Sequence, residues 1–197
     1  MKKTTVLITL ILLISTSLSF SQEKKEETKE VLKPALLVID IQNAYLQMIP
    51  EREKEVAMYM INMYIDLFHS KGYPVIRIYH HSDTWGPHPG SEEFEFPASV
   101  RTLDSDPKVI KTYPDAFNKT GLDQVLKETN SNTLFLTGLS AIGCVLATWI
   151  GANDHDYDAF LVKEAIMSHN SEYTNQVEDM FDAVSYDVIK LILDNAE

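Results

Sequence analysis

The run of consecutive apolar residues from Ala35 to Ile39 constrains the fold of this chain more than any other feature. A strand that is apolar at every position must be covered on both faces, as strands inside a parallel sheet are. Similar strand signals recur along the chain, and helical patterns separate most of them. We expect strands at 35–39, 73–79, 108–111, 133–139, 159–162 and 183–185, and helices at 51–70, 120–129, 142–153, 172–181 and 187–194.

This alternation of strands and helices predicts an α/β fold. Right-handed crossovers between parallel strands place helices on both faces, which gives a three-layer sandwich around a six-stranded parallel sheet. In the helix expected at 51–70, residues with helical spacing predict the face that packs on the sheet. They are Val56, Tyr59, Met60, Met63, Tyr64, Leu67 and Phe68.

The N-terminal residues predict export. Lys2 and Lys3 precede a short apolar run, and small residues follow it, so we interpret residues 1–21 as a signal peptide. An uncleaved anchor is the alternative reading. Residues 22–33 are charged and lack periodicity, which predicts a flexible tether before one domain at 34–197. The mature protein is then periplasmic or secreted, without a membrane partner.

The chain carries a formal net charge of −12. Such a balance repels nucleic-acid phosphates and anionic lipids, and no local basic patch offsets it. Nucleic acid is therefore not an expected partner. A small neutral or cationic molecule remains as the expected substrate.

Cys144 is the only cysteine of the chain. In an oxidising compartment a lone cysteine forms an intermolecular bridge, packs as a small hydrophobe, or serves as a reactive thiol. It follows the strand expected at 133–139, in the predicted first turn of the next helix. Asp40 and Lys111 likewise stand at the ends of strands.

Carboxyl ends of parallel strands meet at one sheet edge, so these three residues predict one site. A helix N-terminus and the Lys111 ammonium would lower the pKa of the Cys144 thiol. Asp40 could take the thiol proton and return it to a leaving amine. Taken singly, Asp40 could instead cap a turn, Lys111 could be solvated, and Cys144 could pack under the sheet. Together they predict amide hydrolysis through a thioester.

Three segments carry a family resemblance. They are ALLVIDIQN at 35–43, Lys111 followed by Ala116 and Phe117, and LTGLSAIGCV at 136–145 followed by Thr148 and Ala152. With 162–168, they resemble the isochorismatase-like cysteine hydrolases. The resemblance implies a six-stranded parallel sheet, a catalytic triad of Asp40, Lys111 and Cys144, and a homo-oligomer. It also implies a cis peptide between Leu139 and Ser140, with the Ser140 and Cys144 N–H groups as the oxyanion hole.

The chain departs from the nicotinamidase branch of this family. That branch has an Asp-x-His metal motif, but here Ile78 and Tyr79 stand two residues before His80 and His81. We therefore expect no metal and no other cofactor. A metal near His80, His81 and His88 remains an open alternative, although adjacent residues of an extended segment point to opposite faces.

Tyr45, His80 and Trp85 are the predicted substrate-binding residues, with core packing as the alternative for Trp85. The hypothesis is a cysteine-dependent hydrolase that opens an amide, imide or carbamoyl C–N bond of a small molecule. One alternative is vinyl-ether hydrolysis of the isochorismate type. Another is a catalytically idle binding or assembly protein on the same fold. Phosphoryl transfer on Asp40 is disfavoured because no second aspartate stands beside it to hold magnesium.

Overall fold

The computed structural model describes residues 31–84 and 86–196. The predicted signal peptide, most of the predicted tether and Trp85 lie outside these ranges. The elements are β1 (Pro34–Ile39), α1 (Asn43–Leu46), α2 (Glu51–Ser70), β2 (Val75–His80), β3 (Lys108–Lys111), α3 (Leu122–Glu128), β4 (Thr133–Leu139), the π-helical turn η1 (Ala141–Val145), α4 (Leu146–Asp154), β5 (Asp158–Met167), α5 (Ser171–Met180) and α6 (Tyr186–Asn195).

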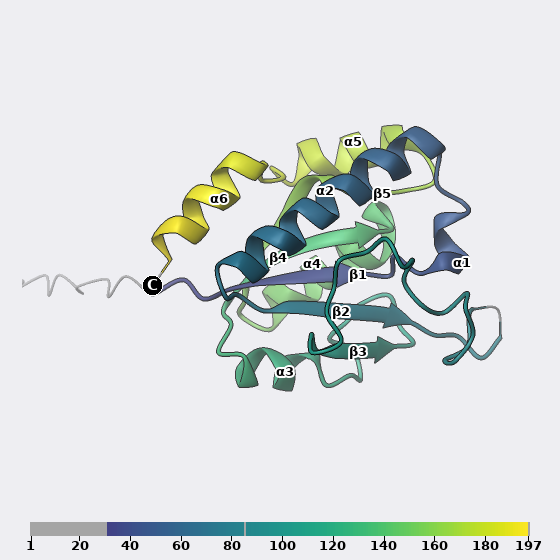
Figure 1. Ribbon diagram of the computed structural model, residues 1–197, viewed down its shortest axis with the longest axis horizontal. Coiled ribbons are helices and arrows are strands. Elements are labelled where there is room, and N and C mark those ends of the chain that lie inside the picture. Colours follow the sequence, from purple (N-terminus) through teal and green to yellow (C-terminus); the bar gives the residue numbers. More distant parts are fainter. Residues whose placement is uncertain (1–30, 85, 197) are drawn as a thin grey trace, which may run out of the picture. The chain divides into compact units, whose positions relative to one another are not determined.

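The strands form one parallel sheet in the order β3-β2-β1-β4-β5 (Figure 1). Every residue of β1 is buried, as its unbroken apolar sequence predicts for an interior strand. The predicted parallel α/β sheet is thus confirmed.

Helices cover both faces of the sheet. Alternate residues of β1 point to opposite sides, so Leu36 and Val38 pack in one core while Leu37 and Ile39 pack in the other. The first core lies under α2 and α6, and the second involves α3, α4 and α5. In Figure 1, α2 crosses in front of the strands and α4 lies behind them. The sheet and the helices on its two faces therefore form the predicted three-layer sandwich.

The predicted sixth strand at 183–185 is wrong, because the sheet has five strands. Only Val184 pairs with β5, through its N–H to the Leu161 carbonyl at 2.8 Å and its carbonyl to the Lys163 N–H at 3.0 Å. The Ala183 N–H bonds back to the Glu178 carbonyl in α5. Ser185 is already the N-cap of α6. A single residue between two helices is too short to build a ladder.

The buried stripe of α2 differs from the predicted one. The predicted Tyr64, Leu67 and Phe68 are buried, but Val56 and Tyr59 are exposed, and Ala57, Ile61 and Ile65 belong to the buried face in addition. Both sets have helical spacing, so spacing alone does not decide how far the buried face is rotated about the helix axis. None of the helices within 31–84 and 86–196 combines the length and apolar character needed to cross a bilayer.

The sheet changes its winding direction between β1 and β4. From β1 the chain builds outward through β2 and β3, then returns to place β4 on the other side of β1. In open α/β sheets, such a switch point opens a crevice at the carboxyl ends of the strands. Gly138, near the end of β4, has φ +108°, and a Cβ there would lie 2.0 Å from the Ile39 carbonyl oxygen. Glycine therefore allows β4 and β1 to approach at this crevice.

Candidate active site

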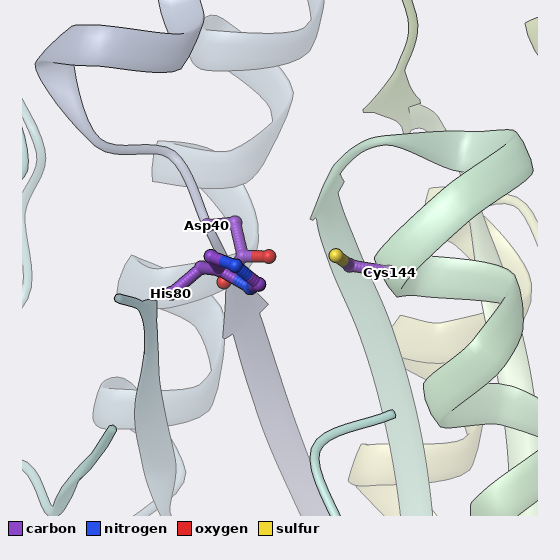
Figure 2. A group of neighbouring side chains, drawn as sticks. All are labelled: Asp40, His80 and Cys144. Carbon is purple, nitrogen blue, oxygen red and sulfur yellow. The ribbon is translucent and has the colours of Figure 1, made fainter. Parts of the chain in front are cut away.

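The ends of four adjacent strands bring the chemically important side chains into one row. Across the sheet, Lys111 ends β3, His80 ends β2, Asp40 follows β1, and Cys144 follows β4. Figure 2 shows Asp40 and His80 together on one side, with the Cys144 sulfur directed toward them from the turn after β4. The structure therefore brings together the three residues predicted as a triad, with His80 among them.

Asp40 lies where β1 leaves the sheet. Its backbone has φ +53°, a left-handed conformation that aspartate tolerates better than most residues. Asp40 is buried, and its Oδ2 accepts a 2.7 Å hydrogen bond from the Lys111 Nζ. A carboxylate oxygen of Asp40 lies within 4.8 Å of the Cys144 sulfur, and the buried Asp40 Oδ1 has no hydrogen-bond partner within the described residues. One carboxylate thus pairs with an ammonium and lies beside a thiol.

Lys111 is buried as a charged group and donates to three acceptors. They are the Asp40 Oδ2 at 2.7 Å, the His80 Nδ1 at 3.1 Å and the Tyr113 carbonyl at 3.3 Å. An ammonium has three N–H groups, so these contacts account for all of them. A buried ammonium is tolerated when it is paired and hydrogen-bonded in this way.

His80 is held in place by Gln42. The His80 N–H donates to the Gln42 Oε1 at 2.7 Å, and the Gln42 amide donates back to the His80 carbonyl at 3.0 Å. Because β1 leaves the sheet at Asp40, the side chain of Gln42 replaces a neighbouring strand at this point. Burial first, and then the charges of Lys111 and His81, lower the pKa of His80 to about 4.

Cys144 lies in a different local structure from the one predicted. The sequence predicts a regular helix from Ile142, but residues 141–145 form a π-helical turn in which the Val145 N–H bonds to the Ser140 carbonyl at 3.2 Å. Gly143 has non-helical angles within it, and α4 begins only at Leu146. Cys144 therefore lies just before the N-cap of α4, Val145, and not within the first turn of a regular helix.

The surroundings of Cys144 favour the protonated thiol over the thiolate. Burial and the adjacent Asp40 raise the pKa of Cys144 to about 12, although Lys111 opposes this change. Burial likewise raises the pKa of Asp40 above 3.8, again against the effect of Lys111. The lowered pKa predicted from the ammonium and the helix is therefore wrong, because the cost of burying charge is the larger effect here.

Tyr45, in α1, lies beside this row. Its ring meets the His80 ring edge-on at 6.1 Å between centroids. Its hydroxyl oxygen is buried and has no hydrogen-bond partner within the described residues. Burial and then the charges of Asp40 and Cys144 raise the pKa of Tyr45. The predicted cis peptide between Leu139 and Ser140 is confirmed.

Two groups of side chains have the composition of metal ligands. The ligand atoms of Asp40, His80 and Cys144 lie within 4.8 Å of one another, as do those of a second group formed by His81, Asp83 and His88. His80 and His81 thus belong to different groups, as their opposite orientation predicts. The Lys111 ammonium already neutralises the first group. In the second, His81 bonds to the Pro87 carbonyl and to Asp83.

Sequence reasoning missed Gln42 as part of this site and Lys111 as a partner of His80. Gln42 was visible only as a member of the 35–43 motif. Its position two residues after Asp40 signals a side chain close to the strand end.

Comparisons with known proteins agree on one family. The isochorismatase domain family matches residues 34–189. An uncharacterised isochorismatase family protein of Bacillus subtilis, YrdC, is 29% identical over 81% of this chain and 86% of its own length. The structure of N-carbamoylsarcosine amidase from Thermoplasma acidophilum is 25% identical, with a TM-score of 0.66 over 78% of this chain and 95% of that chain.

A further structure supports the fold. The isochorismatase-like hydrolase from Alkaliphilus metalliredigens has a TM-score of 0.74 and 19% identity, covering 84% of this chain and 98% of that one. The domain match covers the row of Lys111, His80, Asp40 and Cys144 from end to end. On the fold and the extent of this match, the chain belongs to the isochorismatase family of hydrolases.

Proposed function

We propose that this protein hydrolyses a C–N bond of a small molecule through an acyl-enzyme on Cys144. The substrate class is an amide, imide or carbamoyl compound. The observation that carries the proposal is the buried Asp40 carboxylate, which bonds to the Lys111 ammonium at 2.7 Å and lies within 4.8 Å of the Cys144 sulfur. A carboxylate and an ammonium beside a thiol support the roles of base, fixed positive charge and nucleophile.

In the first half of the proposed reaction, the Cys144 sulfur attacks the substrate carbonyl carbon as its proton moves to Asp40. The C–S bond forms, and the carbonyl oxygen becomes an oxyanion. We propose that the Ser140 and Cys144 N–H groups stabilise this oxyanion; donors of this kind are typically worth a few kcal/mol each. Asp40 then returns its proton to the leaving nitrogen as the C–N bond breaks.

In the second half, water attacks the thioester and gives its proton to Asp40. The C–S bond breaks, the proton returns to sulfur, and the free acid leaves. The raised pKa values of Asp40 and Cys144 suit this cycle, because each group holds the proton in turn. Lys111 remains charged and stabilises whichever of the two is negative.

The charges of the site favour a neutral substrate. The ion pair of Asp40 and Lys111 cancels its own charge, and His80 and Cys144 are neutral at pH 7. The buried Tyr45 hydroxyl is the proposed polar contact for the substrate, because an unpartnered buried hydroxyl is costly unless a ligand completes it. The similarity to an N-carbamoylsarcosine amidase supports carbamoyl compounds as first candidates.

The test is a panel of amides, imides and carbamoyl compounds incubated with the protein, with ammonia release as the readout. Cys144→Ala should abolish turnover and remove any thioester adduct from the intact mass spectrum. Ile142→Ala, in the same turn but 43% exposed, is the matched control and should retain turnover. Full activity of Cys144→Ala would refute the acyl-enzyme. Turnover of isochorismate alone would support the vinyl-ether alternative.

A further inference from the structure

His80 lies between the two members of the ion pair. Lys111 is on β3 and Asp40 follows β1, so one whole strand separates them. Strand spacing of about 4.8 Å puts their backbones roughly 10 Å apart. Lys111 must therefore extend past β2 to reach Asp40. At that level β2 presents His80, the register partner of Lys111.

The ring of His80 supplies an acceptor along this path. Its Nδ1 lies 3.1 Å from the Lys111 Nζ, and an ammonium can only donate. The Nδ1 must therefore be unprotonated, which places the ring proton of the neutral imidazole on Nε2. A protonated ring would instead set two positive charges against each other. His80 is only 7% exposed, so water would not screen that repulsion effectively.

The backbone of His80 is fixed independently of its ring. The two hydrogen bonds from fully buried Gln42 hold the His80 N–H and carbonyl at the end of β2. The ring meets Tyr45 edge-on, and the charged or titratable groups facing it are Lys111, Asp40, Cys144 and His81. A residue whose backbone and ring are both held in this way can orient a neighbouring side chain.

We propose that His80 is a positioning residue: as a neutral acceptor it directs the Lys111 ammonium onto Asp40 and toward the Cys144 sulfur. The expected effect on kcat rests on the proposed function, whereas the expected tautomer of His80 does not. It replaces the direct substrate contact expected from the sequence. The loss of His80 should therefore slow the chemical step and leave substrate binding nearly unchanged.

The structural consequence can be tested without a substrate. In the intact protein labelled with 15N in its histidine rings, His80 should be the neutral Nε2–H tautomer from pH 6 to 8, assigned by the signal that His80→Asn removes. A ring proton on Nδ1, or a charged ring at pH 6, would overturn the proposal. Either outcome is independent of whether the protein hydrolyses amides.

The kinetic consequence is tested with two variants of the same residue. Asparagine places an oxygen acceptor near the position of Nδ1, and leucine removes the acceptor at similar size. His80→Leu should lower kcat about tenfold or more with KM within about threefold, the loss expected when a hydrogen bond serves the transition state. His80→Asn should restore most of that rate.

His81→Leu is the matched control, since the His81 ring bonds to Pro87 and Asp83, and the bond of His81 to Lys111 joins backbone atoms that the substitution keeps. It should retain kcat. An equal loss of kcat in His80→Asn and His80→Leu, or a change confined to KM in both, would overturn the positioning role. Thermal melting of each variant confirms that the fold is retained. If no substrate is found, the proposed function fails while the tautomer measurement still decides the structural claim.

Discussion

Replacing Lys111 by methionine tests the energetic basis of the site. The Lys111 side chain is fully buried and that of Asp40 is 3% exposed. Removing one partner of a buried ion pair leaves an uncompensated charge, which typically costs about 3–5 kcal/mol of the free energy of unfolding. For a domain of this size we expect the melting temperature to fall by roughly 6–20 °C.

The stability lost in Lys111→Met should depend on pH, and the pKa of Asp40 determines whether the loss grows or shrinks as pH rises. Burial already raises the pKa of this carboxyl from 3.8 against the effect of Lys111, so the variant should raise it further. A folded-state pKa above the unfolded one favours folding at low pH, and that contribution is lost as pH rises toward the folded value. The loss of a charge beside His80 acts in the same direction, because a protonated imidazole could then pair with Asp40 in acid.

The assay is urea unfolding at pH 5 and pH 8. Lys111→Met should be destabilised more at pH 8 than at pH 5. The double variant Asp40→Asn/Lys111→Met, which removes both charges, should be more stable at pH 8 than Lys111→Met, and its difference in stability from the unsubstituted protein should change less between pH 5 and pH 8. Lys190→Met, which breaks an exposed pair with Asp194, should barely change stability. Equal losses at both pH values, or no recovery in the double variant, would refute this reasoning.

Three further predictions concern the same edge of the sheet. Iodoacetamide should label native Cys144 slowly at pH 7.5 and faster above pH 9, because the pKa of its thiol is raised to about 12; rapid labelling at neutral pH would contradict this. Gln42→Leu should lower the free energy of unfolding by about 2–4 kcal/mol in urea titrations, since two buried backbone groups of His80 lose their partner. An unchanged unfolding midpoint would show that these two hydrogen bonds of Gln42 do not stabilise the fold. Gly138→Ala should not yield soluble folded protein, whereas Gly72→Ala, with open space around it, should cost only about 1 kcal/mol; equal yields would refute the close approach of β4 to β1.

The location of the triad could be predicted because it follows from periodicity. Asp40, Lys111 and Cys144 each come directly at or after an apolar strand, and parallel strands carry their carboxyl ends to one edge. No knowledge of strand order is needed for that step. The resemblance of the surrounding segments then gives the three residues their expected roles, and it also predicts the cis peptide before Ser140, which the structure contains.

The contacts within the site could not be predicted because they depend on strand order. Only the order β3-β2-β1 places His80 between Lys111 and Asp40. From the sequence, His80 is one of two adjacent histidines at the start of an irregular segment, and lining a pocket is an equally good interpretation. The predicted strand at 183–185 is wrong for a related reason, because the sequence of a short apolar segment does not show how many of its residues pair with the sheet.

The protonation of Cys144 depends on more than its immediate neighbours. A lysine and a helix start lower the pKa of an exposed thiol, but here the three N–H groups of Lys111 point to Asp40, His80 and Tyr113. On the half-buried Cys144 thiol, the charge of Asp40 raises the pKa more than the charge of Lys111 lowers it. Such a thiol should react poorly with adventitious electrophiles. In the proposed mechanism, the Asp40 carboxylate that helps burial to keep the resting sulfur neutral is also the group that accepts its proton during attack.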